Sequence, residues 1–572
     1  MNPSQRSRAR FGLICALIAA GLLEASLYWT QIVKGHTYAS KAQAQYIRPA
    51  GSLFDRGTIF FQPKDGGHIA AATVSSGFVA YMNPTAVKDP SGEFDAVSGY
   101  LKLDKADFLR RAAKPNDQYE ELGKQLDSDT AASIQGLALP GVGVVKQTWR
   151  SYPGGDLAAH LLGLIGEDAS SSVPSGKYGL ERSYESVLSR LPIGSSNAFA
   201  SLFSGKGSVF GNASADEGDV VTGIEPTVQG YLEKLLVDTE ATWHSDEIGG
   251  IVIDPQTGQI VAMASLPTFN PNDTSTVKSV GVFTDPMVQH VYELGSIMKP
   301  LTMATALDSG AVTQNTTYDD TGCMVLDKKK ICNYDGRARG VIPMQQILSQ
   351  SLNVGAATIA LKVGKEGINK YFYSFGLGTT TGIDLPNEAT GITSNLKLGK
   401  DIDIATASYG QGIAVTPVNM ARALSILANG GYLITPHVAS EVDYSDGRVV
   451  KVDPPKSGPV LKQETVDEVR QMLVKVVDGT MAPAHADMNF EHYTVAAKTG
   501  TAEIADHVNG GYYKDRYLHS FFGFFPAYNA RFLVFLYQIY PKGAQYASET
   551  LTDPFAQMAK FLMNYYNIPP DR

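Results

Sequence analysis

The most constraining feature of the sequence is an apolar stretch close to its amino terminus. Residues 1–10 contain three arginines and no acidic residue, and residues 11–29 form an apolar run in which Glu24 is the single charged side chain. As a helix this run of about 19 residues would be about 28 Å long, close to the hydrocarbon thickness of a bilayer. Because basic segments stay on the cytoplasmic side, we expect a cytoplasmic tail over residues 1–10, a single transmembrane anchor over residues 11–33 in the cytoplasmic membrane, and the remaining chain outside.

Two points of this interpretation have alternatives. A cleaved signal peptide would use residues 13–23 as its apolar core and would export the chain equally. Glu24 either contacts another membrane protein, because a carboxylate within a bilayer is costly without a partner, or lies near enough to the outer interface to reach water. In each case the bulk of the chain is exported, where disulfides can form.

Composition narrows the class of protein further. Of the 572 residues 44% are hydrophobic and 18% charged, which excludes extensive disorder. Asp and Glu number 57 against 48 Lys and Arg, for a formal net charge of −9, which disfavours nucleic acid as a partner. With three cysteines and neither Cys-x-x-Cys nor His-Glu-x-x-His, the sequence predicts no disulfide-dense scaffold and no metal site, and we expect no cofactor.

Hydrophobic periodicity divides the exported part in two. Residues 34–217 mix short strand patterns with a helical region near 91–135, and their last stretch, 194–217, is rich in Gly, Ser, Ala and Asn, which predicts a linker. Over residues 218–572 the pattern is a strand pair, a helical block, three strands and a final helix; the strands are expected at 249–254, 259–264, 493–497, 519–525 and 532–540, and the helix at 553–566. This order predicts an α/β fold of the α+β type, with a central antiparallel sheet flanked by helices, behind a smaller mixed α/β domain.

Ser296 and Lys299 form the first of three short motifs that carry chemistry. They lie three positions apart at a predicted helix start, which puts both side chains on one face, so that the amine can take the hydroxyl proton. The same spacing occurs elsewhere, for example at Ser275 and Lys278, and the pair alone therefore has little specificity.

Two further motifs follow in order. Ser351-Leu352-Asn353 stands at a predicted helix end and supplies a hydroxyl that can relay a proton and an amide that can hold a substrate carbonyl. Lys498-Thr499-Gly500-Thr501 stands at the predicted end of an apolar strand, where the lysine and the hydroxyls can bind a carboxylate and Gly500 lets an extended peptide approach closely. Together the three motifs predict an acyl-transfer site.

The motif set is the one found in penicillin-binding proteins and class A β-lactamases. Over nearly its whole length the sequence resembles the class B penicillin-binding proteins, membrane-anchored D,D-transpeptidases that cross-link peptidoglycan. Further matching segments are Arg150-Ser151-Tyr152-Pro153, Gly179-Leu180-Glu181, Asp254-Pro255-Gln256-Thr257-Gly258, Phe375-Gly376-Leu377-Gly378, Tyr409-Gly410-Gln411-Gly412 and Thr416-Pro417. Two positions depart from the family pattern: Leu294 stands where proline is common, and Phe61 where an acid is usual.

The resemblance implies a catalytic role for each motif. Ser296 attacks the penultimate D-Ala carbonyl of a stem peptide, Lys299 accepts its proton, Ser351 relays the proton to the leaving D-Ala, and Asn353 positions the acyl chain. The fold implied is that of the serine β-lactamases, on a non-catalytic pedestal over residues 34–217.

The same resemblance implies the residues that hold the substrate. Lys498 acts with Thr499 on the terminal carboxylate or the proton network, next to Gly500. The backbone N–H groups of Ser296 and Thr501 hold the oxyanion. Tyr409 and Gln411 are further residues expected to line the site, and the alternative is that the segment Tyr409-Gly410-Gln411-Gly412 is only a tight turn.

The partners implied are peptidoglycan stem peptides, β-lactam antibiotics that acylate Ser296, and a membrane glycosyltransferase of the SEDS family together with other cell-wall synthesis proteins. Two alternatives to a transpeptidase stay open. A β-lactamase or β-lactam sensor would need a fast route to deacylation, and an inactive scaffold would retain the fold without the chemistry.

Cys323 and Cys332 are nine positions apart in a polar stretch that is typical of a hairpin. In an exported domain they could close a small loop, and the alternative is two free thiols. Cys15 lies in the predicted anchor and cannot join them.

Overall fold

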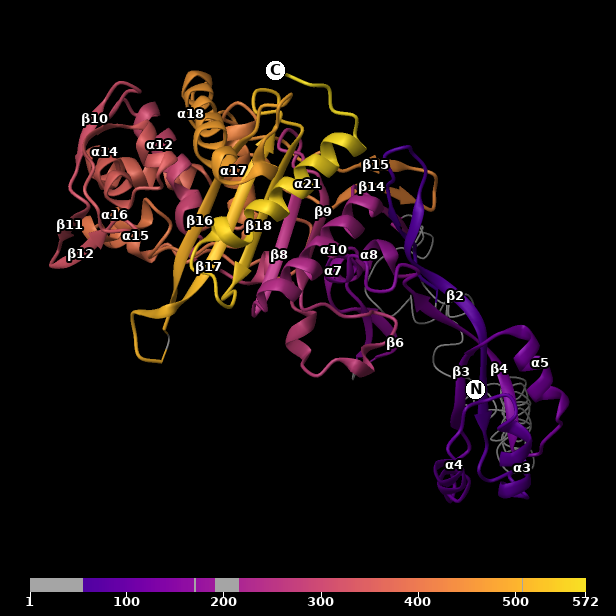
Figure 1. The fold of residues 1–572 in the computed structure, drawn as a ribbon. Helices are drawn as coiled ribbons and strands as arrows, with labels where there is room; N and C mark the ends of the chain where they lie inside the picture. The colour runs from indigo at the N-terminus through magenta and orange to yellow at the C-terminus, as the bar shows by residue number, and fades with distance from the viewer. Residues whose placement is uncertain (1–54, 169–170, 191–215, 507) are drawn as a thin grey trace, which may run out of the picture. The chain divides into compact units, whose positions relative to one another are not determined.

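A five-stranded antiparallel sheet forms the centre of the carboxyl-terminal part of the chain (Figure 1). The computed structural model describes residues 55–168, 171–190, 216–506 and 508–572. The strand order is β16-β17-β18-β8-β9, with neighbours antiparallel throughout. The strands are β8 (Glu247–Ile253), β9 (Ile260–Leu266), β16 (Ala496–Ala505), β17 (Tyr512–Phe525) and β18 (Phe532–Ile539). The predicted antiparallel sheet is therefore present, and it joins segments far apart in the sequence.

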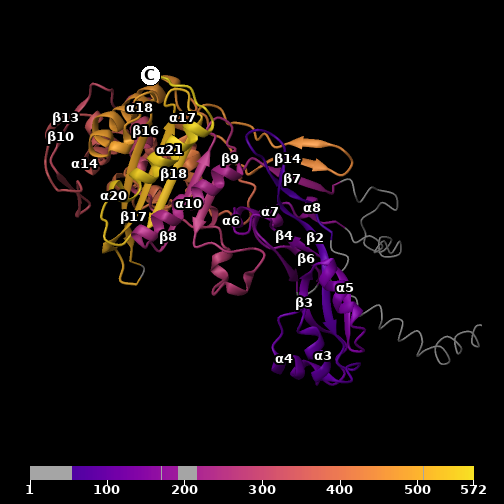
Figure 2. The same ribbon diagram turned by 45° about the vertical axis from the view of Figure 1, so that its right-hand side comes forward.

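Helices cover both faces of this sheet (Figures 1 and 2). α10 (Pro226–Trp243) and α21 (Thr552–Tyr565) lie side by side, where the rings of Tyr231 and Phe561 stack at 3.9 Å. α17 (Pro417–Ala428) and α18 (Gln463–Val476) pack against the other face of the sheet. Because both faces are covered, β18 is buried almost throughout and has a continuous apolar sequence instead of an alternating one.

Edge strand β16 adjoins a mostly helical region. A short 3-10 turn over Gly295–Met298 leads into α12 (Lys299–Asp308), and a second group of helices follows along the chain. These helices are α13 (Gln345–Ser349), α14 (Asn353–Ser374), α15 (Ser394–Leu398) and α16 (Asp401–Ala407). Two small antiparallel pairs precede α13: β10 (Thr317–Asp320) with β13 (Gly340–Pro343), and β11 (Cys323–Leu326) with β12 (Lys329–Cys332).

A second sheet joins the start of the described chain to the segment after the linker. β1 (Ile59–Phe61) pairs in parallel with β7 (Gly218–Thr222), which pairs with β14 (Ala439–Tyr444) and through it with β15 (Val449–Lys451). The elements within residues 159–188 are α6 (Ala159–Leu162), β5 (Ile165–Asp168), β6 (Ser171–Gly176), α7 (Gly179–Ser183) and α8 (Glu185–Leu188), and α8 contacts β7.

A buried carboxylate ties this part of the chain together. Glu181 is fully buried and receives one hydrogen bond from Arg56 Nε at 2.5 Å and another from Arg150 Nε at 2.6 Å. A buried charge is tolerated only when it is paired in this way. Arg150 and Glu181 belong to the segments that carry the family resemblance, and their role is structural.

Residues Ser75–Trp149 form a separate compact unit. Its elements are the distal part of β2 (Ile69–Met82), α3 (Pro90–Val97), α4 (Lys105–Ala112), β3 (Glu120–Leu126), α5 (Ser128–Gly136) and most of β4 (Val142–Ser151). Its core includes Phe94 and Phe108, whose rings meet edge to face at 5.5 Å. Residues 56–74 and 150–190 group by their contacts with the carboxyl-terminal part of the chain.

Three local predictions are wrong. Two of the short strand patterns within residues 34–217, at 68–73 and 77–82, predict separate strands but form one strand, β2. The helical region expected near 91–135 contains strand β3, whose mostly polar sequence gives no strand signal. The strand expected to end at residue 497 instead runs to Ala505, so the Lys-Thr-Gly motif lies within it. The predicted anchor over 11–33 lies outside the described residues. So does the predicted linker over 194–217, except for its last two residues. Within the described ranges, no helix is both long and apolar enough to cross a bilayer.

Candidate active site

The three motifs meet at one cavity of about 910 Å³ next to β16. Of the residues predicted for the site, all line this cavity except Lys299 and Gly500, which lie beneath its surface; those that line it are Ser296, Ser351, Asn353, Lys498, Thr499, Thr501, Tyr409 and Gln411. Residues separated by about 200 positions are therefore brought into one cleft.

Lys299 is the centre of the hydrogen-bond network. Its side chain is 1% exposed, and Nζ lies 2.8 Å from Ser296 Oγ. Nζ also donates to the Ser351 carbonyl oxygen at 2.8 Å and to Asn353 Oδ1 at 2.8 Å. A neutral amine has two N–H donors and one lone pair. When the two acceptors without hydrogens take both donors, the lone pair is left for a hydroxyl, and the nearer of the two hydroxyl oxygens is Ser296 Oγ at 2.8 Å, against 3.1 Å for Ser351 Oγ.

Burial favours the neutral form of this lysine. Removal from water lowers the pKa of Lys299 well below its ordinary value, and the positive charge of Lys498 lowers it further. Lys498 is 2% exposed, and its burial lowers its pKa to about 7. A lysine whose pKa is lowered well below its ordinary value, beside one with a pKa of about 7, fits a site where the first acts as a base and the second retains a charge for binding.

The Ser351 hydroxyl links the two lysines. Ser351 Oγ is 3.1 Å from Lys299 Nζ and accepts a hydrogen bond from Lys498 Nζ at 3.0 Å. The backbone of Ser351 has a φ of +54°, in the left-handed region that few residues other than glycine adopt. The turn between α13 and α14 thus holds a strained serine with its hydroxyl between two amines.

Gly500 allows β16 to pack against the turn that carries the nucleophile. A Cβ added at Gly500 would lie 2.2 Å from Ser520 Oγ and 2.6 Å from the Leu294 carbonyl oxygen. The Ser520 hydroxyl donates to that same carbonyl at 2.7 Å. The turn and the strand are therefore in contact at the position where the backbone N–H groups of Ser296 and Thr501 are expected to form an oxyanion hole.

Tyr409 and Gln411 lie on a turn that supports the nucleophile from the other side. A Cβ at Gly410, whose φ is +83°, would be 2.0 Å from the Gly295 carbonyl oxygen, so only glycine fits. Burial raises the pKa of the Tyr409 phenol, which lies with its ring centre 6.0 Å from Lys299 Nζ. Gln411 Nε2 is buried and has no hydrogen-bond partner among the described residues.

Several residues that line the cleft were not predicted. Thr499, Thr501 and Glu503 occupy every second position of β16 and all line the cleft. A predicted strand that continued past the Lys-Thr-Gly motif would have placed Glu503 on the same face. Tyr512 also lines the cleft and donates a hydrogen bond from its hydroxyl to Glu293 at 2.9 Å; nothing in the sequence pattern indicates this pair. A hairpin segment, residues 329–334, forms another part of the wall.

Cys323 and Cys332, predicted either to pair or to remain free, are joined by a disulfide in this hairpin. The two residues lie opposite each other in the β11–β12 ladder, with Cα atoms 4.1 Å apart. Within the part of the chain that the structure describes, no group of His, Cys, Asp and Glu side chains is placed to hold a metal ion.

Comparison with known proteins gives two matching family models and many relatives. The model described as the penicillin binding protein transpeptidase domain matches residues 248–559, and the penicillin-binding protein dimerisation domain matches residues 55–190. The chain is 29% identical to stage V sporulation protein D of Bacillus subtilis, over 97% of this chain and 84% of that protein. It is 25% identical to the peptidoglycan D,D-transpeptidase FtsI of Escherichia coli K12, over 98% of this chain and 92% of that one.

Solved structures give the same fold. Penicillin binding protein 3 from Mycobacterium tuberculosis, complexed with aztreonam, matches with a TM-score of 0.67 at 22% identity, over 91% of this chain and 98% of that one. Penicillin binding protein 2X from Streptococcus thermophilus matches with a TM-score of 0.72 at 20% identity, over 91% and 81% of the two chains.

Proposed function

Because the chain belongs to the penicillin-binding protein family, we propose that it is a peptidoglycan D,D-transpeptidase in which Ser296 is the nucleophile. One relative bears that activity as its name. The observation that carries the proposal is the distance of 2.8 Å between Lys299 Nζ and Ser296 Oγ, in surroundings that lower the pKa of the lysine. A serine hydroxyl is a weak nucleophile until a neighbouring base takes its proton.

In the acylation step Ser296 Oγ attacks the penultimate D-Ala carbonyl carbon of a donor stem peptide, and its proton passes to Lys299 Nζ. The negative charge that develops on the carbonyl oxygen is held by the backbone N–H groups of Ser296 and Thr501. The second hydrogen of Asn353 Nδ2 and Gln411 Nε2, which has no partner among the described residues, offer donors to the rest of the acyl chain.

Collapse of the tetrahedral intermediate requires a proton on the leaving D-Ala nitrogen. Ser351 Oγ lies within hydrogen-bond distance of Lys299 Nζ and Lys498 Nζ, which supports a relay from Lys299 through this hydroxyl. Lys498 in its charged form, with Thr499, orients the terminal carboxylate of the donor. An amine of a neighbouring stem then attacks the ester carbonyl carbon, and its proton passes to Lys299. As the C–Oγ bond breaks, Lys299 returns this proton to Ser296 Oγ, and the cross-link is formed.

A β-lactam would acylate Ser296 by the same first step, because it presents a strained amide to the same atoms. The experiment is therefore labelling of the full chain with a fluorescent penicillin, in the wild type and in Ser296→Ala. Ser275→Ala is a matched control, because Ser275 belongs to another Ser-x-x-Lys pair outside the cleft. Label that depends on Ser296, persists for hours and survives Ser275→Ala is expected.

The same measurement separates the other two functions. Loss of label within seconds would favour a β-lactamase or sensor over a transpeptidase. A wild type that takes no label would favour a scaffold without catalysis.

The architecture proposed with this function is an anchor over 11–33, a non-catalytic pedestal over 34–217 and a transpeptidase domain over 218–572. The family matches over 55–190 and 248–559 support the last two.

A glycosyltransferase of the SEDS family is proposed as the partner in the cytoplasmic membrane, in contact with Glu24. Co-purification of that enzyme with the wild type but not with Glu24→Leu is expected, and equal recovery would contradict the contact.

A further inference from the structure

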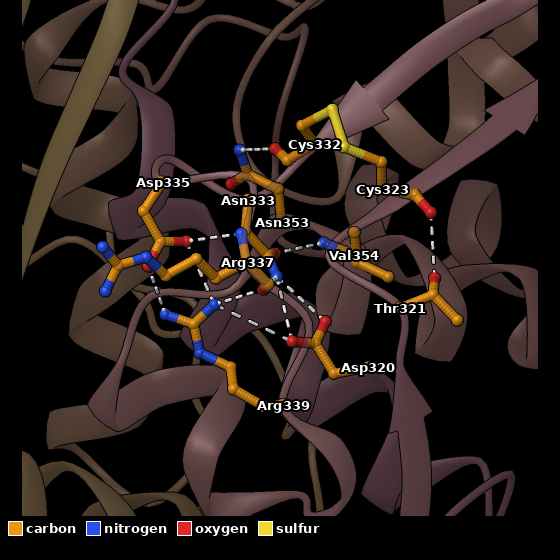
Figure 3. The surroundings of a disulfide bond; sticks show 10 residues. All are labelled: Asp320, Thr321, Cys323, Cys332, Asn333, Asp335, Arg337, Arg339, Asn353 and Val354. Atoms are coloured by element: carbon orange, nitrogen blue, oxygen red, sulfur yellow. Dashed lines mark hydrogen bonds and ion pairs between the residues drawn. A yellow bond between two sulfur atoms is a disulfide. The ribbon is translucent and has the colours of Figure 1, made fainter.

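The disulfide hairpin, residues 323–333, contacts the first turn of α14, which carries Asn353 (Figure 3). Cys332 supplies a backbone carbonyl oxygen that accepts a hydrogen bond from Asn353 Nδ2 at 3.0 Å. The next residue, Asn333, contacts Val354. The hairpin is thus joined to the two residues at the start of the helix.

The side chain of Asn353 lies between partners of opposite polarity. Oδ1 faces Lys299 Nζ, which donates to it, and Nδ2 faces the Cys332 carbonyl, which only accepts. A rotation of the amide by 180° would break both bonds, so the two contacts fix its orientation. An amide nitrogen carries two hydrogens. With one held by Cys332, the other can be presented to an acyl group in the cleft.

Asn333 caps the helix from outside it. The residue before α14, Leu352, makes no side-chain cap, and Asn333 Oδ1 accepts a hydrogen bond from the Val354 N–H at 3.1 Å. Asn333 Nδ2 in turn donates to both carboxylate oxygens of the fully buried Asp320, at 2.9 and 3.0 Å. Helix ends need such partners, because their first N–H groups have none within the helix.

Cys332 is therefore both a disulfide partner and the residue that holds Asn353. The disulfide ties it to Cys323 on the opposite strand, and the neighbouring Asn333 is 3% exposed. The opposite end of the hairpin is free of this restraint: Val325 is 67% exposed. A hairpin of two short strands has little stability of its own in water, so a covalent link at its base limits how far the Cys332 carbonyl can move.

We propose that the disulfide hairpin is a positioning element for Asn353, and that the Cys323–Cys332 bond sets the rate of Ser296 acylation by holding the Cys332 carbonyl in place. This inference rests on the proposed transpeptidase function. It assigns a role to the hairpin that is separate from the nucleophile, the base and the proton relay.

The test compares acylation by a fluorescent penicillin in the full-length wild type, in Cys323→Ala/Cys332→Ala, and in wild type reduced with dithiothreitol and alkylated. Cys15→Ser is the matched control for loss of a cysteine. A second-order acylation rate about tenfold lower in the first variant and in the reduced protein is expected, the value of one well-placed hydrogen bond. Cys15→Ser should acylate like the wild type.

A second readout separates positioning from stability. Asn353 Oδ1 accepts from Lys299, which favours the charged amine, so loss of this contact should shift the acid limb of the acylation pH profile to lower pH. The charged neighbour of Lys299 is Lys498 on β16, and the other titratable group close to it is Tyr409. Both are unchanged in the variants. A hairpin that only stabilises the fold would lower the melting temperature and leave the profile where it is.

An exchange of polarity gives a further check. Asn333→Asp alone places a carboxylate against buried Asp320 and should slow acylation, whereas Asp320→Asn/Asn333→Asp restores an amide–carboxylate pair and an acceptor for the Val354 N–H. Recovery in the double variant supports the proposal. Wild-type rates and pH profiles in the cysteine variant and the reduced protein would overturn it, whereas absence of Ser296-dependent label in the wild type would instead contradict the proposed function.

Discussion

Lys498 Nζ donates a hydrogen bond to Ser351 Oγ at 3.0 Å, and so joins the strand at one side of the cleft to the turn at the other. The lysine is held by β16 and the serine by the junction of α13 and α14. Neither the hydroxyl nor the amine of this pair is hydrogen-bonded to the Ser296 side chain, so a substitution at either residue tests the mechanism and leaves the nucleophile unchanged.

Removal of the Ser351 hydroxyl should separate catalysis from stability. Ser351→Ala and Ser351→Gly both lose the proton relay, so acylation should fall about 100-fold in each. The glycine variant relieves the φ of +54°, and should be more stable than the alanine variant by about 1 kcal/mol. Penicillin acylation rates and denaturant unfolding measure the two effects. Equal stability of the two variants would contradict the strain, and wild-type rates would contradict the relay.

The acylation rate should have a maximum with pH. It rises as Lys299 loses its proton, because only the neutral amine can act as a base, and falls above about pH 7 as Lys498 becomes neutral and no longer binds a carboxylate. Lys498→Arg retains its charge at all these pH values, so the fall above pH 7 should disappear. The measurement is kcat/KM for a β-lactam or the acylation rate against pH. A fall retained in Lys498→Arg would assign it to another group.

Stability should also depend on pH through Lys498. Its folded pKa of about 7 lies below the ordinary 10.5, so between these values the unfolded state binds more protons and the free energy of unfolding rises with pH. Lys498→Met removes this contribution. It should flatten the rise between pH 7 and 10.5, raise stability at pH 7 and abolish carboxylate binding. Urea unfolding at several pH values is the measurement, and parallel curves for wild type and variant would contradict the lowered pKa.

Gly500→Ala should disrupt both the site and the fold. Its Cβ would meet the Leu294 carbonyl oxygen and Ser520 Oγ, and displacement of the nucleophile turn should cost about 1–3 kcal/mol of stability and most of the acylation rate. Gly479→Ala is the matched control, since no atom lies within 4 Å of a Cβ there. A Gly500→Ala protein as active and as stable as the control would show that strand and turn can separate freely.

Much of the fold could be predicted because its central strands are apolar on both sides. The hairpin of β8 and β9 and the long run of β18 stand out in the sequence for this reason. The sequence predicts too short a strand at β16 because polar residues that face the cleft alternate along its second half. It predicts no strand at β3 because Leu122 and Leu126 are the large apolar residues among otherwise polar ones and Gly123. The alternation of apolar and polar residues reveals a strand only where one or both of its faces are buried, and these two segments are only partly buried.

The motif residues could be predicted, but their surroundings could not. Ser296 and Lys299 are neighbours on one turn, so that their contact follows from spacing. The contacts of Asn353 with the Cys332 carbonyl and of Asn333 with the Val354 N–H depend on how the hairpin folds back on the helix. A carbonyl oxygen has no sequence signature, and its position is known only when the fold is.

The pairing of β1 with β7 bears on the order in which the chain can fold as it leaves the ribosome. The N–H of Thr58 donates to the Asp219 side chain, 161 positions away, and the Ser440 hydroxyl donates to the Val221 carbonyl, 219 positions away. β1 can pair with β2 soon after it is made, but its other edge has no partner until β7 has been made from residue 218 onward, and the second edge of β7 then waits for β14. Such distant pairing slows folding and leaves strand edges open in the meantime. The amino-terminal strands of this chain would need protection from self-association during synthesis, long before the nucleophile has a cleft around it.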